Sequence, residues 1–208
     1  MEVAKRVTYR HGDLHQALLD AGVQLAREGG PDAIVLREAT RRAGVVPNAA
    51  YRHFADRRAL LHAVCAASQS ALAVAIEIEL ATLPSHIDPV ATARARLRAV
   101  GTGYMRFAQT ESGLFRTVFS VPDTTQNSVP AGVGAGGLTA FQLLATTLDG
   151  LVDAGILPVE RRPSAEYLAW SAVHGLATLI IDGPLRSLDS AQTHAIGELL
   201  LDMVERGL

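Results

Sequence analysis

Apolar residues recur every three or four positions through most of this chain, which is the spacing of one face of a helix. The first segment with this spacing carries Leu14, Leu18, Ala21 and Leu25. Asp13, with Gln16 three positions later, predicts a capping box at the start of this helix, and the glycine pair 29–30 predicts its end. Alternating apolar and polar residues, the pattern of a strand, form no convincing segment. The sequence therefore predicts an all-α fold.

Two short helices and one long helix are predicted next. The first short helix covers residues 36–43 and ends at Gly44, and the second begins at Pro47, because the first turn of a helix does not need the N–H that proline lacks. Asp56 is a suitable cap for the long helix, which continues without glycine or proline to about Leu83. At 1.5 Å per residue it spans roughly 40 Å. We expect this helix to join two lobes.

The second half of the chain predicts five further helices, which makes about nine in all. The first opens at Asp88-Pro89, and its apolar stripe is predicted to be core: Val90, Ala93, Leu97, Val100, Tyr104 and Phe107. A short apolar segment, 114–119, leads into residues 121–137, where proline and glycine predict a loop that is a candidate gate. The last three helices are predicted over residues 138–152, 164–181 and 189–204, with a capping box at Asp189.

The net charge of −2 hides an uneven distribution of charged residues. Residues 1–62 carry ten Lys or Arg against seven Asp or Glu, whereas residues 63–208 carry nine against fourteen. A positive first lobe is what binding to the phosphates of DNA requires. The polar, basic first ten residues exclude a secretory signal, and no uninterrupted apolar stretch reaches the roughly 18 residues of a membrane span. We therefore expect a cytoplasmic protein that does not enter a membrane.

Metal and cofactor signatures are missing from the sequence. Cys65 is the only cysteine, so the chain has neither an intrachain disulfide nor a CxxC pair for zinc, and we expect a small buried side chain there. His11 and His15 are four residues apart, but no third ligand lies near them in the sequence. We predict no metal site and no cofactor.

Residues 34–54 combine two short helices with a tight turn at Gly44, which is the arrangement of a helix-turn-helix. The outward positions of its second helix are Pro47, Asn48, Ala49, Tyr51, Arg52 and His53, and all of them except Ala49 are candidate DNA contacts. Asn48 suits adenine edges and Arg52 suits guanine edges or phosphate. Tyr51 and His53 suit phosphate oxygens. A recognition helix in the major groove of double-stranded DNA is the prediction.

Other polar residues of the first lobe are weaker candidates. For Thr40, packing between helices and contact with a phosphate both remain open. Lys5, Arg6 and Arg10, just before the first helix, are candidates for phosphate or minor-groove contacts. Arg41 and Arg42 are expected to be solvated surface.

The stretch GVxxxxxYRHFxDRxALL, residues 44–61, resembles the DNA-binding head of the tetracycline-repressor (TetR) family. The resemblance covers about residues 9–64 and implies that Tyr51, His53 and Arg57 touch the DNA backbone. The opening YRHGDLHQALLDAG and the stretch W-x-x-x-H-G-L-A at residues 170–177 resemble a subgroup of that family. Val46 replaces the family's usual capping serine, a loss that costs about 1 kcal/mol. The family's usual phosphate-binding threonine is Ala49, and its usual Ile-Ala pair is Ala39-Thr40.

The second lobe offers candidates for a ligand pocket and for a dimer interface. The residues predicted to line the pocket are Tyr104, Phe107, Phe115, Phe119, Phe141, Trp170 and His174. Plain core is the alternative for the six aromatic residues, and a bond to a backbone carbonyl is the alternative for the histidine. The helices over 164–181 and 189–204 are apolar on more than one face, which predicts a homodimer joined by a four-helix bundle.

These observations predict a transcriptional repressor, not an enzyme, that binds a palindromic operator as a dimer and is released by a small-molecule effector. Residues 9–64 form the predicted helix-turn-helix domain, and residues 65–208 the ligand-binding and dimerisation domain. One alternative is a helical enzyme or ligand carrier that uses His174, Asp182 and Cys65. The other is an interaction protein whose head no longer binds DNA. Salt-dependent DNA affinity separates these alternatives from the prediction.

Overall fold

The computed structural model describes residues 11–84, 88–121 and 132–208, which form nine α-helices. The helices of the first lobe are α1 (His11–Gly29), α2 (Leu36–Arg42) and α3 (Pro47–Ala50). The others are α4 (Arg57–Ala81), α5 (Pro89–Thr110), α6 (Ser112–Val118), α7 (Ala140–Asp153), α8 (Ala165–Ile181) and α9 (Ser190–Gly207). Two short 3-10 turns cover Pro31–Ala33 and Val159–Arg161. In these ranges the only extended pairing is an isolated bridge between Val133 and Thr139, so the all-α prediction is confirmed.

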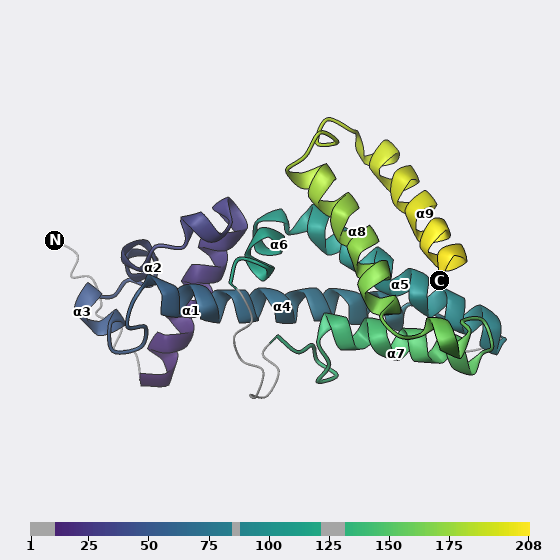
Figure 1. Ribbon diagram of the computed structural model, residues 1–208. Coiled ribbons are helices and arrows are strands. Elements are labelled where there is room, and N and C mark those ends of the chain that lie inside the picture. The colour runs from purple at the N-terminus through teal and green to yellow at the C-terminus, as the bar shows by residue number, and fades with distance from the viewer. Residues whose placement is uncertain (1–10, 85–87, 122–131) are drawn as a thin grey trace.

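The molecule has a head and a body at opposite ends of α4 (Figure 1). The head consists of α1, α2, α3 and the start of α4, and the body consists of the rest of α4 with α5 to α9. Asp56 caps α4 as predicted, since its carboxylate accepts a bond of 2.7 Å from the Ala59 N–H. At the head end α4 packs on α1, and at the body end it packs on α5 and α7. One helix therefore contributes to the cores of both lobes.

The long helix α4 is also the one described helix that is long and apolar enough to cross a membrane by length and composition. Part of its apolar surface lies inside the protein instead: Leu60 and Val64 are buried in the head, and Leu72 and Ile76 are buried in the body, whereas Ile78 is exposed. A helix that passes through two cores has the same composition as a membrane span. The burial accounts for its apolar character.

Glycines end the first two helices where the sequence predicts. Gly30 follows α1 with φ 70°, and Gly44 follows α2 with φ 68°, a left-handed backbone that glycine adopts without steric cost. The predicted start of α1 is wrong, because the backbone is already helical at His11, two residues before Asp13. A capping residue has a non-helical backbone, so Asp13 lies inside the helix and is not its cap.

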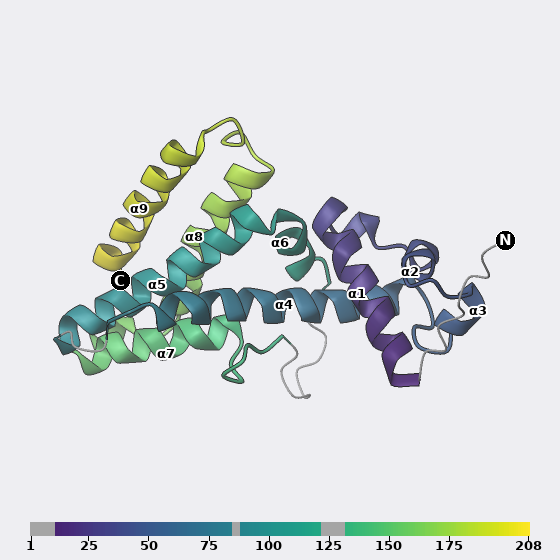
Figure 2. The same cartoon turned by 180° about the vertical axis from the view of Figure 1, so that it is seen from behind.

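The body packs its helices around α5, which contacts α4, α6, α7, α8 and α9. Asp88 caps α5, and the apolar stripe of α5 is buried as predicted except for Val90, which is 39% exposed. Val90 lies in the first turn of the helix, where fewer neighbours cover it. The C-terminal helix α9 packs on α5 and α8, and from both sides it forms the outer edge of the body (Figure 2). The predicted capping box of Asp189 and Gln192 opens this helix.

Candidate DNA interface and ligand cavity

The third helix of the head is shorter than predicted. α3 ends at Ala50, and residues 51–53 form a turn in which the N–H groups of His53 and Phe54 both donate to the Ala50 carbonyl at 2.9 Å. The chain leaves the helix here because Phe54 packs into the core of the head and Asp56 takes an extended backbone to cap α4. Val46 provides no side-chain cap for α3, as the sequence indicates. Tyr51 and Arg52 therefore lie in the turn and not on the helix.

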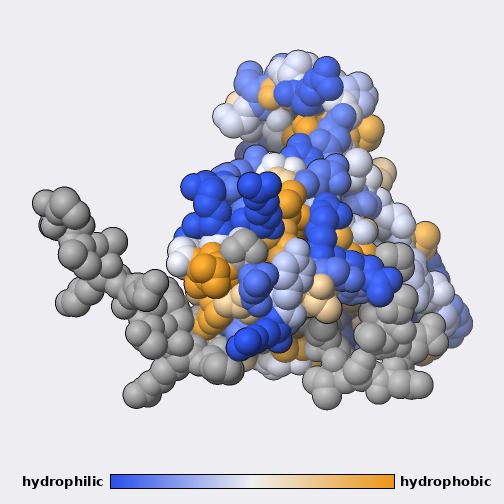
Figure 3. Space-filling model, turned by 90° about the vertical axis from the view of Figure 1, so that its left-hand side faces the viewer, coloured by the Kyte–Doolittle hydropathy of each residue, from blue (hydrophilic) through white to orange (hydrophobic). Residues whose placement is uncertain are grey.

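The exposed part of this segment faces away from the body. Asn48, Tyr51 and Arg52 are exposed, with 58% of Tyr51 accessible. From the head end the surface is mostly hydrophilic with smaller apolar patches (Figure 3). The expected outward position of His53 is wrong. Its ring is half-buried with a centroid 6.2 Å from that of His15, which itself stacks on Phe54 at 4.7 Å.

Two other candidate DNA contacts have internal partners. Thr40 is only 2% exposed and its hydroxyl donates to the Arg37 carbonyl at 2.6 Å, which favours packing over phosphate contact. The guanidinium of Arg57 donates to the carbonyls of Ile34 at 2.7 Å and Pro31 at 2.8 Å, so it ties the start of α4 to the segment before α2.

The remaining candidates of the head are not placed. Lys5, Arg6 and Arg10 lie outside the described residues, and the side chain of Pro47 is not described either. DNA contact stays a prediction for every candidate residue of the head.

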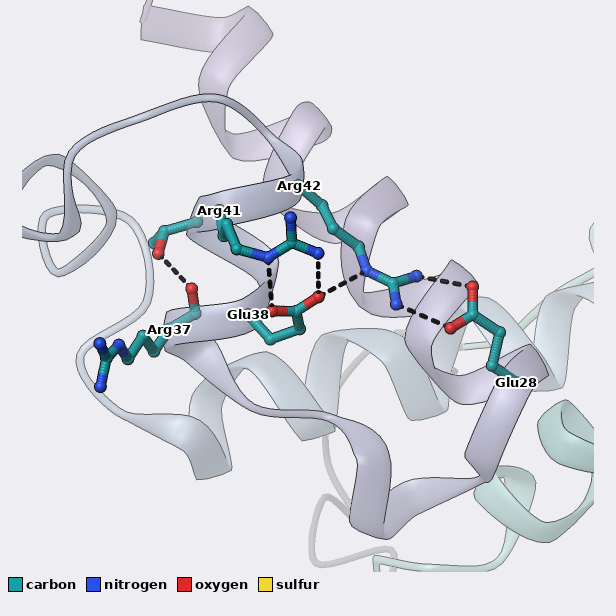
Figure 4. Close-up of polar contacts among 6 residues, drawn as sticks. Glu28, Arg37, Glu38, Arg41 and Arg42 are labelled. Atoms are coloured by element: carbon teal, nitrogen blue, oxygen red, sulfur yellow. Dashed lines mark hydrogen bonds and ion pairs between the residues drawn. The ribbon is translucent and has the colours of Figure 1, made fainter.

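A network of ion pairs joins α1 to α2 (Figure 4). Arg42 donates two bonds of 2.7 Å to Glu28 of α1 and one of 3.1 Å to Glu38. Arg41 donates two bonds, of 2.8 and 2.7 Å, to the same Glu38 carboxylate. Hydrogen bonds from both arginines lower the pKa of Glu38 to about 2. Both arginines are exposed, as expected for solvated surface, although 28% of the Arg42 side chain is accessible against 71% for Arg41.

Sequence reasoning missed two cations on the head. Arg37 and Arg58 are exposed, and neither forms an ion pair or a side-chain hydrogen bond within the described residues. Arg52 likewise forms no ion pair or side-chain hydrogen bond within the described residues. The other described arginines of the head all have such partners: Arg27, Arg41, Arg42 and Arg57. The basic pair 57–58 was a signal, but it could not show which arginine bonds to backbone carbonyls of the head.

The body contains a cavity of about 660 Å³ bounded by α4, α5, α7, α8 and α9. Four of the predicted pocket residues line it: Tyr104, Phe119, Phe141 and Trp170. Phe107 and Phe115 do not, because both are buried in the core instead. His174 does not line the cavity but contacts Tyr104, which does. Ligand contact at these positions stays a prediction.

Tyr104, Trp170 and His174 form a hydrogen-bonded group at the wall of the cavity. The Tyr104 hydroxyl lies 2.8 Å from Nδ1 of His174 and accepts a bond of 3.3 Å from the Trp170 indole N–H. Burial raises the pKa of the Tyr104 hydroxyl and lowers the pKa of His174. The histidine is thus satisfied by a side chain and not by the backbone carbonyl that the alternative interpretation supposed.

The residues of the enzyme alternative do not form a catalytic group. The Cys65 thiol is buried as expected and donates to the Val118 carbonyl at 3.2 Å. Arg116 binds both oxygens of Asp182, and this bonding lowers the pKa of the aspartate. His174 is bonded to Tyr104. Within residues 11–84, 88–121 and 132–208, no three His, Cys, Asp or Glu side chains gather as metal ligands would.

Several residues of the cavity were not predicted from the sequence. Leu201, Val204 and Glu205 reach it from α9, which sequence reasoning assigned to the dimer interface. Gln69 and Leu72 reach it from α4. Apolar spacing shows which face of a helix is covered, but it does not show whether protein or empty space covers it.

Comparison with solved structures supports the same fold. A protein of unknown function from Rhodococcus sp. RHA1 is 27% identical, with a TM-score of 0.75 and coverage of 97% of this chain and 98% of that one. TetR from Acinetobacter baumannii AYE is 20% identical (TM-score 0.62, coverage 91% and 93%). FadR from Bacillus subtilis, solved in complex with stearoyl-CoA, is 13% identical (TM-score 0.61, coverage 93% and 99%). No curated protein matches the chain.

Family models match both lobes. The model of bacterial regulatory proteins of the tetR family matches residues 18–64, which contain the helix-turn-helix. The model of the tetracyclin repressor-like C-terminal domain matches residues 97–204, about half of the chain. The subgroup suggested by the motif at residues 170–177 stays a prediction. The head with its helix-turn-helix and the helical body with its cavity thus match the two halves of one family, and the chain belongs to the TetR family of bacterial regulatory proteins.

Proposed function

We propose that this protein is a ligand-responsive transcriptional repressor without enzymatic activity that acts in the cytoplasm. In this proposal residues 9–64 bind DNA, and residues 65–208 bind the effector and form the dimer. The observation that carries the proposal is the pairing of an exposed recognition segment with a cavity in the body of the same family member. The protein binds a palindromic operator in the absence of effector and leaves it when the cavity is filled.

The exposed side chains of the recognition segment supply the DNA contacts. Asn48 reads adenine edges, Arg52 reads a guanine edge or binds phosphate, and Tyr51 binds phosphate. Arg37 and Arg58 add phosphate contacts at either side of that segment. This assignment leaves out Thr40, which is buried, and Arg57, whose guanidinium is bonded to two backbone carbonyls.

A homodimer through α8 and α9 supports the two-fold symmetry that a palindromic operator requires. Exposed apolar side chains lie on both helices: Leu168 is 67% exposed and Leu199 is 68% exposed, and Tyr167, Leu179 and Met203 are exposed as well. Val173 and Leu176, also expected at the interface, are buried within their own body. The exposed residues are numerous enough to form the core of a four-helix bundle with a second copy.

The cavity gives the effector a place to act. Its volume lies within the range of sites for small molecules, and its wall is formed by five helices, one of which, α4, continues into the head. An effector shifts the head only as far as it binds the two arrangements of the dimer with different affinity.

The proposal is tested by mobility shift with DNA from upstream of the protein's own gene, at two salt concentrations. We expect a discrete, salt-sensitive complex with the wild-type protein and none with the double variant Tyr51→Ala, Arg52→Ala. Arg186→Ala, an exposed arginine in the loop between α8 and α9, removes a positive charge from the body and is the matched control. If no upstream fragment shifts, the head does not bind DNA and the interaction-protein alternative replaces the proposal.

A further inference from the structure

The charged side chains that line the cavity neutralise each other. In the described ranges these are Arg98 of α5 and Glu205 of α9. Arg98 donates to Glu198 at 2.7 Å and to Asp202, and its second amino group lies 3.8 Å from Glu205. Glu205 in turn accepts a bond of 2.5 Å from Arg94. Among the described residues, a ligand that enters the cavity therefore meets no cation or carboxylate that lacks a partner.

Several neutral polar groups along the wall are also bonded to the protein itself. The Tyr104 hydroxyl is shared between His174 and Trp170. The side-chain amide of Gln69 donates to the Val118 carbonyl at 3.3 Å, and Gln142 and Thr139 form the capping box of α7.

The rest of the wall is apolar and aromatic. Leu72, Ile76 and Leu201 line one part of it. Phe119 and Phe141 each pack on Trp170 with ring centroids 5.7 Å apart, so three rings form one continuous surface. Such a surface binds apolar ligands by contact area and does not compensate a buried charge, which costs several kcal/mol when it has no partner.

From these contacts we infer that the effector is an uncharged, largely apolar small molecule. That the ligand acts as an effector rests on the proposed function. The preference of the cavity for uncharged ligands does not depend on it. An anion finds Arg98 already bound to three carboxylates, and a cation finds Glu205 already bound to two arginines.

The inference is tested with probes that have the same number of carbon atoms but headgroups of different charge. These are 1-octanol, octanoate and octylammonium at neutral pH. Trp170 is the only tryptophan in the chain and lines the cavity, so its fluorescence reports binding. Titration calorimetry with 1-naphthalenemethanol, naphthoate and naphthylmethylammonium repeats the series with a ring. We expect the uncharged member of each series to bind at least about tenfold more tightly than either ion.

Two variants test the cause of that selectivity. Arg98→Gln leaves the carboxylates of α9 with one arginine fewer, so octylammonium gains affinity. Glu205→Gln removes a negative charge from the wall and leaves Arg98 with one carboxylate fewer, so octanoate gains affinity. Arg186→Gln lies outside the cavity and changes neither. Circular dichroism confirms that each variant is folded.

The inference is overturned if an ion binds the folded wild-type protein as tightly as the alcohol of its series, or if neither alcohol binds. Its failure is distinct from failure of the proposed function. A DNA complex together with preference for a charged probe removes the inference and keeps the repressor. Preference for the alcohols without any DNA complex keeps the inference and removes the repressor.

Discussion

Neighbouring arginines in the head have different roles that their sequence positions do not reveal. Arg57 donates to two carbonyls of the segment before α2, whereas Arg58 is exposed and has no ion pair among the described residues. The family resemblance assigns a DNA contact to Arg57. In the structure Arg57 ties the start of α4 to the segment before α2, and its contact with DNA stays a prediction. Arg58 is exposed and forms no ion pair within the described residues.

We expect Arg57→Gln to destabilise the protein by about 1 kcal/mol or more even without DNA, because two carbonyl groups lose their charged donor. Arg58→Gln is the matched variant. It leaves the free energy of unfolding unchanged but lowers operator affinity and the slope of its salt dependence by about one ion. Urea unfolding and mobility shifts measure the two effects. Equal stability of the two variants would contradict the structural role of Arg57.

Gly113 of α6 lies directly against the backbone of α1 in the head. A Cβ atom there would lie 2.1 Å from the Ala26 carbonyl oxygen and 2.5 Å from that of Arg27, and backbone atoms of α1 cannot move aside singly. We expect Gly113→Ala to destabilise the protein by about 1–3 kcal/mol through overpacking. Gly150→Ala in α7, where the added methyl meets open space, is the control and stabilises by up to about 1 kcal/mol. Urea unfolding curves with equal slopes would measure both changes.

At the scale of elements, three of the four predicted capping residues were correct, and Asp13 was not, whereas features that depend on distant residues were not predicted. Asp56, Asp88 and Asp189 cap their helices as predicted, because the acceptor and the donor lie within three residues. The predicted length of α3 was wrong, because the end of this helix depends on Phe54 packing into a core formed by other helices. The bond between Arg42 and Glu28 spans fourteen residues and two helices, so no local pattern indicates it.

The network between α1 and α2 predicts how the head responds to acid. Glu38 has a pKa of about 2 in the folded protein against an ordinary value of 4.5. A carboxylate with a lowered folded pKa contributes stability above its unfolded pKa and loses it as pH falls through the folded one. We therefore expect the stability advantage of wild type over Glu38→Gln to shrink between about pH 4.5 and pH 2.

Thermal unfolding midpoints across that pH range measure this prediction as the difference between the two proteins. Asp153→Asn, an exposed carboxylate of α7 without an ion pair in the described residues, is the control for general charge effects. A constant difference between wild type and Glu38→Gln at every pH would show that the ion pairs do not contribute to stability.

At the scale of the whole molecule, sequence patterns located the two lobes but not the cavity between the helices. The aromatic residues were identified by type, and four of six line the cavity. Phe107 and Phe115 fall outside because the same helical spacing serves core and cavity. The contribution of α9 was missed because Gly101 on α5 lets Leu201 approach closely, a contact between residues a hundred positions apart.

The exposed apolar residues of α8 and α9 predict that a second copy of the chain covers them in a dimer. We expect the double variant Leu168→Arg, Leu199→Arg to be monomeric at concentrations where wild type is dimeric, because each leucine contributes about 1.5–3 kcal/mol when buried and each arginine adds a charge without a partner. Sedimentation equilibrium measures the assembly. Ile78→Arg, at an exposed apolar position on α4, is the control and leaves the dimer intact.

Measuring operator affinity separates loss of the dimer from loss of DNA contact. A folded monomer retains its recognition segment but binds only half-sites, and binds them weakly. A dimer that survives both arginines would place the interface elsewhere on the body and leave the apolar faces of α8 and α9 for another partner.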